Sequence, residues 1–230
     1  RLRLGDIAYV VMGGSETRER MVAVRGTWGP VDNPRVLLFS DAEDAELRTI
    51  VLGGPAALPG RENAQHKTMM GIRFAVEHGP PAPWTLLCDD DTYVYTNRLR
   101  AFLNRFDPAH PVLLGFSFRS FQYVPGREDQ LVLSEYHYVS GGAGIAASRP
   151  AMEILAANLY TPLCPCVADQ HAPCVNDLTI SSCAWALGIM VVHSPMFGQH
   201  PKLYRPDSLT KHYLRPHEFY AEHAAASRPA

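Results

Sequence analysis

The sequence lacks long hydrophobic runs and any strong excess of charge of one sign. Its longest apolar stretches, such as Ile7–Met12 and Ile189–Val192, are far too short to cross a bilayer. Lysine and arginine total 21 residues against 23 aspartates and glutamates, which gives a net charge of −2 at pH 7. This balance argues against a broad basic face for nucleic acid or for an anionic membrane.

Internal repeats, low-complexity tracts and domain linkers are also missing. The chain has 230 residues, of which 47% are hydrophobic and 19% are charged, values ordinary for a globular protein with a sizeable core. We therefore expect a single domain over residues 1–230. No signal peptide is visible and Arg1 directly precedes a strand-like segment, so we expect any targeting segment or anchor to lie outside this sequence.

Cysteine is scarce, but four of the five cysteines fall within twenty residues: Cys164, Cys166, Cys174 and Cys183. A zinc site is one interpretation, although Cys-Pro-Cys followed by gaps of seven and eight residues does not match a usual zinc spacing. We favour one or two disulfides, formed in an oxidising compartment, with their pairing left open. Cys88 lies in an apolar run and is predicted to be a buried free thiol.

Segments with the apolar runs of strands alternate with segments that have the spacing of helices. The predicted strands are residues 6–12, 35–40, 84–88, 112–118 and 189–193. The predicted helices are residues 15–27, 62–78 and 97–106, with another opening at Ser148-Arg149-Pro150. This alternation predicts an α/β fold with a mainly parallel sheet and helices on both faces. Residues 119–139 are predicted to form a flexible loop or a small hairpin.

The most informative segment is Trp-Thr-Leu-Leu-Cys-Asp-Asp-Asp at residues 84–91, in which a buried strand runs into Asp89, Asp90 and Asp91. Three adjacent carboxylates repel one another, and the cluster becomes favourable if it binds a hard cation such as Mg²⁺ or Mn²⁺. At the carboxyl edge of an α/β sheet, a nucleotide diphosphate and its metal would lie there. The alternative is a solvated acidic turn that caps the next helix.

Two further segments carry candidate site residues. Ser140 is followed by the small residues Gly141, Gly142, Ala143 and Gly144 just before a predicted helix, where a ligand can approach the backbone closely. The alternative is a tight structural turn. Asp177 stands near the start of a helix that ends at Gly188, so it is either a capping residue or a general base that takes a proton from an incoming hydroxyl.

Three basic side chains have two interpretations each. His200 follows the last predicted strand, and is either the imidazole that completes a metal site or an ordinary polar residue. His212 is either a polar group at the sheet edge or a ligand contact. Lys67 either approaches a phosphate or the carboxylates, or is a solvated lysine on an amphipathic helix.

The order of these features resembles that of the fringe-like β1,3-glycosyltransferases, the group that includes fringe and core 1 β1,3-galactosyltransferase. Matching stretches run in the family's order across nearly the whole chain and include Arg25-Gly-Thr-Trp28, Asn176-Asp-Leu-Thr179 and Phe197-Gly-Gln-His200. The other matching stretches are residues 18–21, 38–44, 66–68, 84–94, 140–144 and 212–220. The acidic triplet, the glycine cluster and the later aspartate form the specific part of the set.

The resemblance implies a GT-A fold and an inverting transfer of galactose, N-acetylglucosamine or glucose from a UDP-sugar to an acceptor hydroxyl. The product would be a β1,3 linkage on a glycan or glycoprotein, and the cofactor Mn²⁺ or Mg²⁺. Together with the cysteine cluster, the resemblance implies a Golgi or other secretory lumen, reached through a membrane anchor outside this sequence. No nucleic acid partner is implied.

The resemblance also assigns roles to the candidate residues. Asp91 would ligate the metal most directly, with Asp89 and His200 as further ligands and Asp90 supporting the sugar-nucleotide. Asp177 would be the catalytic base. The remaining donor-binding or acceptor-facing residues would be Lys67, His212, Gly141, Gly142, Ala143 and Gly144. The chain departs from the family at Asn176, where relatives have a second acid, and at Gly198, which replaces the first histidine of fringe's His-Ser-His.

Two other functions remain open from sequence. A catalytically silent fringe-like binding module or partner subunit would have no need for the acidic triplet, Asp177 and His200 together. A metal-dependent phosphohydrolase would use the carboxylates, but the glycine cluster would have no clear task.

Overall fold

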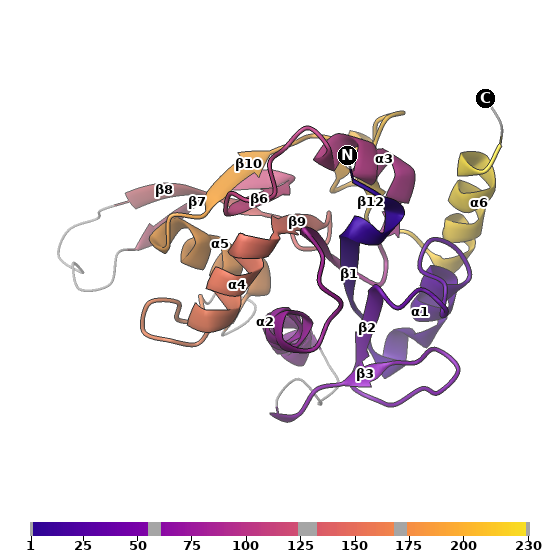
Figure 1. The fold of residues 1–230 in the computed structure, drawn as a ribbon, viewed down its shortest axis with the longest axis horizontal. Coiled ribbons are helices and arrows are strands. Elements are labelled where there is room, and N and C mark those ends of the chain that lie inside the picture. The colour runs from indigo at the N-terminus through magenta and orange to yellow at the C-terminus, as the bar shows by residue number, and fades with distance from the viewer. Residues whose placement is uncertain (1, 55–60, 124–132, 168–173, 229–230) are drawn as a thin grey trace.

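A seven-stranded mixed sheet, in the strand order β10-β6-β9-β4-β1-β2-β3, forms the centre of the fold (Figure 1). The computed structural model describes residues 2–54, 61–123, 133–167 and 174–228. The strands of the sheet are β1 (Ile7–Met12), β2 (Val36–Ser40), β3 (Ile50–Val51), β4 (Trp84–Asp89), β6 (Val112–Gly115), β9 (Ile145–Ser148) and β10 (Met190–His193). All neighbouring pairs are parallel except those of β9, which runs antiparallel to β4 and β6. The predicted α/β fold with a mainly parallel sheet is confirmed.

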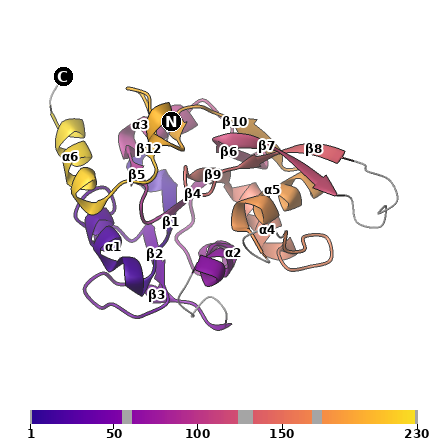
Figure 2. The same cartoon turned by 180° about the vertical axis from the view of Figure 1, so that it is seen from behind.

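Helices cover both faces of this sheet. They are α1 (Arg18–Arg25), α2 (Arg61–Glu77), α3 (Thr96–Leu103), α4 (Arg149–Asn158), α5 (Asn176–Ala186) and α6 (Pro216–Ala226). Because side chains alternate along a strand, Tyr9 and Val11 of β1 join a buried cluster with α1, α3 and α6, whereas Val10 and Met12 join one with α2, α4 and α5. Figure 2 shows α1 and α6 together at one side, and α4 and α5 at the other.

Short strands and turns complete the described fold. β11 (Phe197–Gly198), β12 (Thr210–Lys211) and β5 (Tyr93–Val94) form a small sheet, and 3₁₀ turns cover Leu4–Asp6, Ser15–Thr17 and Pro201–Leu203. β7 (Ser117–Tyr123) and β8 (Leu133–Val139) pair as a hairpin, which confirms one of the two structures expected for residues 119–139. Residues 124–132 lie outside the described residues.

One local expectation was wrong. The glycine cluster does not lead directly into a helix, because β9 intervenes between it and α4. This strand reads Ile-Ala-Ala-Ser, four small or modest side chains that carry almost no strand pattern of their own. It is a strand because β4 and β6 provide hydrogen-bonding partners on both of its edges.

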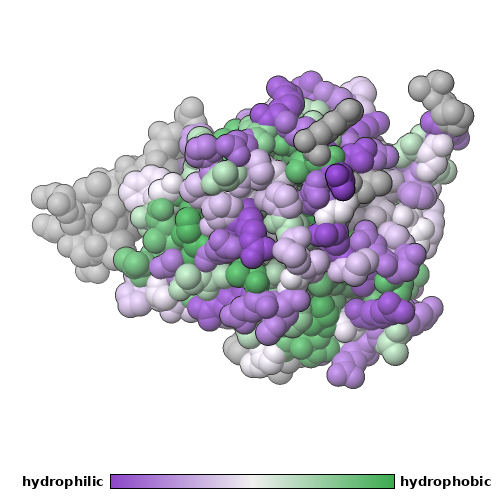
Figure 3. Space-filling view, viewed as in Figure 1, coloured by the Kyte–Doolittle hydropathy of each residue, from purple (hydrophilic) through white to green (hydrophobic). Residues whose placement is uncertain are grey.

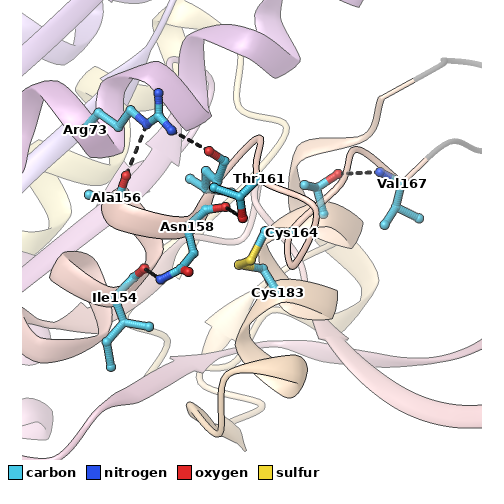
Figure 4. Close-up of a disulfide and its surroundings, with 10 residues drawn as sticks. Arg73, Ile154, Ala156, Asn158, Thr161, Cys164, Val167 and Cys183 are labelled. Atoms are coloured by element: carbon cyan, nitrogen blue, oxygen red, sulfur yellow. Dashed lines mark hydrogen bonds between the residues drawn. A yellow bond between two sulfur atoms is a disulfide. The ribbon is translucent and has the colours of Figure 1, made fainter.

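The four clustered cysteines form two disulfides, Cys164–Cys183 and Cys166–Cys174, and Cys88 is a buried free thiol, as expected. Figure 4 shows the Cys164–Cys183 bond, which joins the segment after α4 to α5. Arg73 of α2 lies nearby, and its Nε donates to the carbonyl of Ala156 at 3.1 Å. Closing loops of this length removes conformational entropy from the unfolded chain, an effect of roughly 3 kcal/mol for a 15-residue loop. One bond is attached two residues before α5 and the other in its last turn, so together they hold α5 to the segment after α4.

The surface has the mixed character of a globular protein. Figure 3 shows polar side chains over most of one face, with apolar residues gathered in small patches. Within the residues that the structure describes, every helix is too short or too polar to span a bilayer.

Candidate active site

A cavity of about 650 Å³ opens where β1 and β4 end, and its volume is typical of a site for a small molecule or cofactor. The carboxyl ends of parallel strands supply its floor. Its walls come from the 3₁₀ turn at Ser15–Thr17, the first turns of α1 and α5, and the segment 140–142. Residues far apart in sequence therefore meet at the sheet edge where ligands bind in α/β folds.

The acidic triplet lies at the bottom of this cavity and does not form a solvated turn. Asp90 and Asp91 are only 4% and 8% exposed. The backbone N–H of Asp90 donates to the carbonyl of Met12 at 2.9 Å, which fastens the turn to β1. The Thr92 hydroxyl donates to the carbonyl of Gly142 at 2.6 Å, which fastens it to the glycine cluster. The three carboxylates are thus held close together, with Asp90 and Asp91 buried and Asp89 partly buried.

Burial disfavours the ionised forms of Asp89 and Asp90. It raises the pKa of Asp89 from 3.8 to about 6, with the neighbouring charge of Asp91 adding to the effect and His212 opposing it. Burial likewise raises the pKa of Asp90 to about 7, although a hydrogen bond from the Thr17 hydroxyl lowers it. A cation among these groups would favour their ionised forms.

His212 faces Asp91 with the nitrogen that a metal would use. Its Nδ1 lies 3.3 Å from the carbonyl oxygen of Gln199 and its Nε2 lies 3.2 Å from Asp91 Oδ1. A carbonyl oxygen only accepts, so Nδ1 carries a proton. In the protonated imidazole, Nε2–H pairs with Asp91 Oδ1, and in the neutral tautomer Nε2 presents a lone pair that can bind a metal ion. Asp91 Oδ1 is buried without a hydrogen-bond partner. When His212 is neutral, two acceptors face each other here, and a cation between them would stabilise the pair.

The residues present fit a divalent metal ion. One ligand atom each from Asp89, Asp91 and His212 lies within 4.8 Å of the other two. Carboxylates suit Mg²⁺ and Mn²⁺, and the imidazole shifts the preference of the set toward Mn²⁺. The hydrogen bond from Nδ1 to a backbone carbonyl is the usual outer partner of a metal-binding histidine.

The structure does not bring His200 into this group. His200 is exposed, and its Nδ1 accepts from the backbone N–H of Lys202 at 3.3 Å, where it caps the turn at Pro201–Leu203. β12 pairs with β5, which begins two residues after Asp91, and this pairing carries His212 to the triplet. The resemblance gave the metal role to His200, whereas the geometry favours His212.

Backbone hydrogen bonds fix the chain on both sides of Tyr213. The N–H of His212 donates to the carbonyl of Gly198 at 2.9 Å, and that of Leu214 donates to the carbonyl of Asp91 at 3.0 Å. Between them Tyr213 has φ of 63°, an unfavourable conformation for a residue with a side chain. Its ring stacks on the imidazole of His212 with centroids 3.7 Å apart, which limits how His212 can turn.

The glycine cluster divides into lining and supporting residues. Gly141 and Gly142 line the cavity. A Cβ at Gly142 would lie 2.1 Å from the His212 ring, so only glycine lets the imidazole reach Asp91. Ala143 is buried, and its carbonyl accepts from the Thr210 hydroxyl at 2.6 Å. Gly144 has φ of 93°, so it makes the turn that leads into β9.

Asp177 lies in the first turn of α5 and lines the cavity, whereas the N-cap position of this helix is held by Val175. Its Oδ1 accepts from the N–H of Leu178 at 2.9 Å, and its Oδ2 lies 3.5 Å from the N–H of Gly141. The preceding Asn176 donates through its side chain to the Thr68 hydroxyl at 2.8 Å, which ties α5 to α2. The charge of Asp177 contributes to the raised pKa of Asp89, since both face the same cavity.

Lys67 lines the cavity but is 2% exposed, so it is not a solvated lysine. Its Nζ donates to the carbonyl of Gly13 at 2.9 Å and pairs with Asp41 Oδ1 at 3.1 Å. Burial raises the pKa of Asp41, but hydrogen bonds from Ser15 and Lys67 outweigh it and bring the pKa to about 2. Lys67 therefore joins α2 to the ends of β1 and β2.

Several lining residues were not predicted, among them Thr17, Arg20 and Asp41. Arg20 Nη1 lies 3.4 Å from Asp91 Oδ2 and 3.6 Å from Asp90 Oδ1. Arg20 and Asp41 belong to the stretches 18–21 and 38–44, which already match the family in sequence. The family match of these stretches was the sequence signal that could have identified the two residues. No local pattern shows that their side chains point toward the triplet.

Comparison with known proteins places the chain. The family described as Fringe-like matches residues 11–218. The chain belongs to the Fringe-like family. This membership agrees with the observed α/β fold and with the family predicted from the order of the motifs.

This Fringe-like chain is similar to transferases of several kinds. It is 30% identical over 197 residues to a mouse protein named β-1,3-glucosyltransferase, a match that covers 85% of this chain and 35% of the mouse protein. It is 29% identical to the β-1,3-galactosyltransferase brn of Drosophila melanogaster, covering 94% and 70%. The chain thus spans about a third of the length of the mouse relative.

Among solved structures, the chain aligns with a glycosyltransferase involved in the glycosylation of the major capsid of PBCV-1. The alignment covers 95% of this chain and 98% of the other, with a TM-score of 0.48 and 14% identity. The relatives with higher identity are named as β-1,3-glycosyltransferases.

Proposed function

We propose that this chain is the catalytic part of an inverting, metal-dependent glycosyltransferase that moves a hexose from a UDP-sugar to an acceptor hydroxyl, forming a β1,3 linkage. One observation carries the proposal. Asp91 Oδ1, buried and without a hydrogen-bond partner, faces the Nε2 of His212 at 3.2 Å inside a cavity that Asp177 also lines. Such an arrangement suits a cation that in turn binds a diphosphate.

In this proposal Asp89, Asp91 and His212 would hold Mn²⁺ or Mg²⁺. Bound there, the cation would stabilise the negative charge that develops on the departing UDP. Asp177 removes the proton from the acceptor oxygen as that oxygen attacks the anomeric carbon. The attack inverts the configuration in one displacement, and no enzyme nucleophile is needed. Gly141 donates its N–H toward Asp177 and thereby holds the carboxylate in the cavity.

The donor is a UDP-sugar carrying glucose, galactose or N-acetylglucosamine, and the acceptor is a glycan, glycopeptide or protein. Relatives named for glucosyl and galactosyl transfer support this range. We also propose a Golgi or other secretory lumen as the location, since two disulfides form readily in an oxidising compartment. Membrane attachment would come from an anchor outside this sequence.

Calorimetry tests the site directly. We expect UDP to bind in the presence of Mn²⁺ and to bind much more weakly in EDTA. Asp91→Ala should abolish the metal-dependent part, because it removes a ligand and leaves His212 without its partner. Asp107→Ala is the matched control, since the Asp107 side chain is exposed and its contacts in the described structure are with its sequence neighbours Ala109 and His110. Equal UDP binding with and without metal would refute a metal-dependent donor site.

Turnover separates this enzyme from a silent Fringe-like module. A thermal-shift screen of UDP-sugars with Mn²⁺ should identify the donor, because a bound ligand stabilises the folded state. The selected donor should then be hydrolysed slowly without acceptor and transferred when acceptor is present. Donor binding without either reaction would favour the silent module.

A further inference from the structure

Arg20 is an arginine that contacts the acidic triplet, yet its contacts there are long. It projects from α1, its side chain is 41% exposed, and it lines the cavity. Its Nη1 reaches Asp91 Oδ2 at 3.4 Å and Asp90 Oδ1 at 3.6 Å, beyond the usual 2.7–2.9 Å of a charge-assisted hydrogen bond. Its positive charge lowers the pKa values of Asp89 and Asp90 against the effect of burial.

The charges of the described lining residues are unbalanced. Six acidic side chains line the cavity: Glu16, Asp41, Asp89, Asp90, Asp91 and Asp177. Lys67 is committed to Asp41 and to the carbonyl of Gly13. His212 uses Nδ1 for the carbonyl of Gln199 and presents Nε2 to Asp91. Among the described lining residues, Arg20 is the permanent cation that remains able to move.

The neighbouring arginine of the same helix shows the contrast. Arg18 pairs with Asp44 and with Glu46, each at 2.7 Å, outside the cavity. Arg20 reaches its two carboxylates through one nitrogen at longer distances, so the other guanidinium nitrogens are left for a further partner. A planar guanidinium fork matches the oxygens of a phosphate.

A divalent cation and Arg20 compete for the same carboxylates. A metal ion that takes Asp91 leaves the guanidinium next to another positive charge and without its partner. A diphosphate that binds the metal brings negative oxygens within reach. We propose that Arg20 is an exchangeable counterion: it neutralises the triplet when no donor is bound and transfers to the diphosphate when metal and donor enter. This inference rests on the proposed function and concerns the leaving group.

The first test is Mn²⁺ affinity without nucleotide, measured by calorimetry. Arg20→Ala removes a competing cation, so we expect Mn²⁺ to bind about threefold to fivefold more tightly than in the wild-type protein. Arg18→Ala, the matched control on the same helix, should leave Mn²⁺ affinity unchanged. If Arg20 only supported the structure, Arg20→Ala would weaken Mn²⁺ binding, because the disturbed carboxylates would be poorer ligands.

The second test is nucleotide affinity at saturating Mn²⁺. Arg20→Ala should weaken UDP binding about 10- to 100-fold, the worth of a hydrogen bond between charged groups. Uridine, which has no phosphate, should bind with unchanged affinity. Arg20→Lys keeps the charge but loses the fork, so it should retain wild-type Mn²⁺ affinity and lose part of the UDP affinity. This variant also serves if Arg20→Ala fails to fold.

The outcomes separate the two proposals. Tighter Mn²⁺ binding together with weaker UDP binding in Arg20→Ala supports the exchange. Unchanged or weaker Mn²⁺ binding overturns it, as does a loss of UDP affinity no larger than that of Arg18→Ala. Absence of metal-dependent UDP binding in the wild-type protein would instead reject the glycosyltransferase site itself.

Discussion

The free energy of unfolding of the metal-free protein should fall as the pH rises from about 4 to about 7. Buried carboxylates that have partners usually show the opposite trend. Burial raises the pKa of Asp89 to about 6 and that of Asp90 to about 7, against 3.8 for each group in the unfolded chain. In this window the folded state holds protons that the unfolded chain has released. The free energy of unfolding therefore decreases with pH.

The size of the effect follows from these values. One pKa unit corresponds to about 1.4 kcal/mol, so ionising Asp89 in the folded protein costs about 3 kcal/mol relative to the unfolded chain. Asp90 adds to this cost, but the two groups interact and their contributions are not additive. We expect a total loss of roughly 3 kcal/mol or more, a large share of the usual 5–15 kcal/mol.

Mn²⁺ should reverse this trend. The metal binds the ionised carboxylates and competes with protons, so its stabilising effect should grow over the same pH range. Urea unfolding at about pH 5 and about pH 7.5, each in EDTA and in excess Mn²⁺, measures both effects. The range stays above the pKa of Asp41, about 2, whose own contribution is lost only at lower pH.

Two variants make the measurement specific. Asp90→Asn removes one titrating group and should flatten the pH dependence in EDTA, whereas Asp107→Asn, at an exposed site, should not. If the wild-type protein in EDTA becomes more stable with rising pH, or if Asp90→Asn keeps the wild-type slope, burial of the triplet is not the cause.

Three further predictions follow from single contacts. Asp177→Asn should lower transfer about 10²–10⁴-fold with UDP and Mn²⁺ binding preserved, and near-normal turnover would reject the base. Gly142→Ala should weaken Mn²⁺ binding at least tenfold, because its Cβ would lie 2.1 Å from the His212 ring; wild-type affinity by calorimetry would show that the imidazole is not a ligand. Lys67→Met should destabilise the protein by about 3–5 kcal/mol in urea unfolding, since the Asp41 side chain loses its positive partner and keeps only the hydrogen bonds from Ser15, and a loss below about 1 kcal/mol would contradict the ion pair.

Most of the main elements were predictable because their signals are local. The apolar run at residues 84–88 and the helical spacing over 62–78 depend on neighbours in sequence, and β4 and α2 are found there. The acidic triplet was placed correctly at the end of its strand for the same reason. β9 and the short strands β5, β11 and β12 were missed, because their pairing partners and not their composition make them strands.

The candidate site likewise contains residues that the sequence identified and residues that only the tertiary structure brings together. Sequence order identified the triplet, the glycine cluster and Asp177, all of which reach the cavity. Sequence order left both His200 and His212 as candidate site residues and assigned the metal to His200. Only the pairing of β12 with β5 brings His212 to Asp91. The sequence also did not predict that Lys67 is buried against Asp41, because the two residues lie on different parts of the chain.

By itself, the amino-acid sequence determined most of the main strands and helices, which residue types are available for chemistry, and the family. Only the tertiary structure decided which cysteines pair, which histidine faces the carboxylates and where Arg20 places its charge. The physical reason is range: helical and strand periodicity is set over a few neighbouring residues, whereas a site is set by distances between side chains that packing brings together from across the chain.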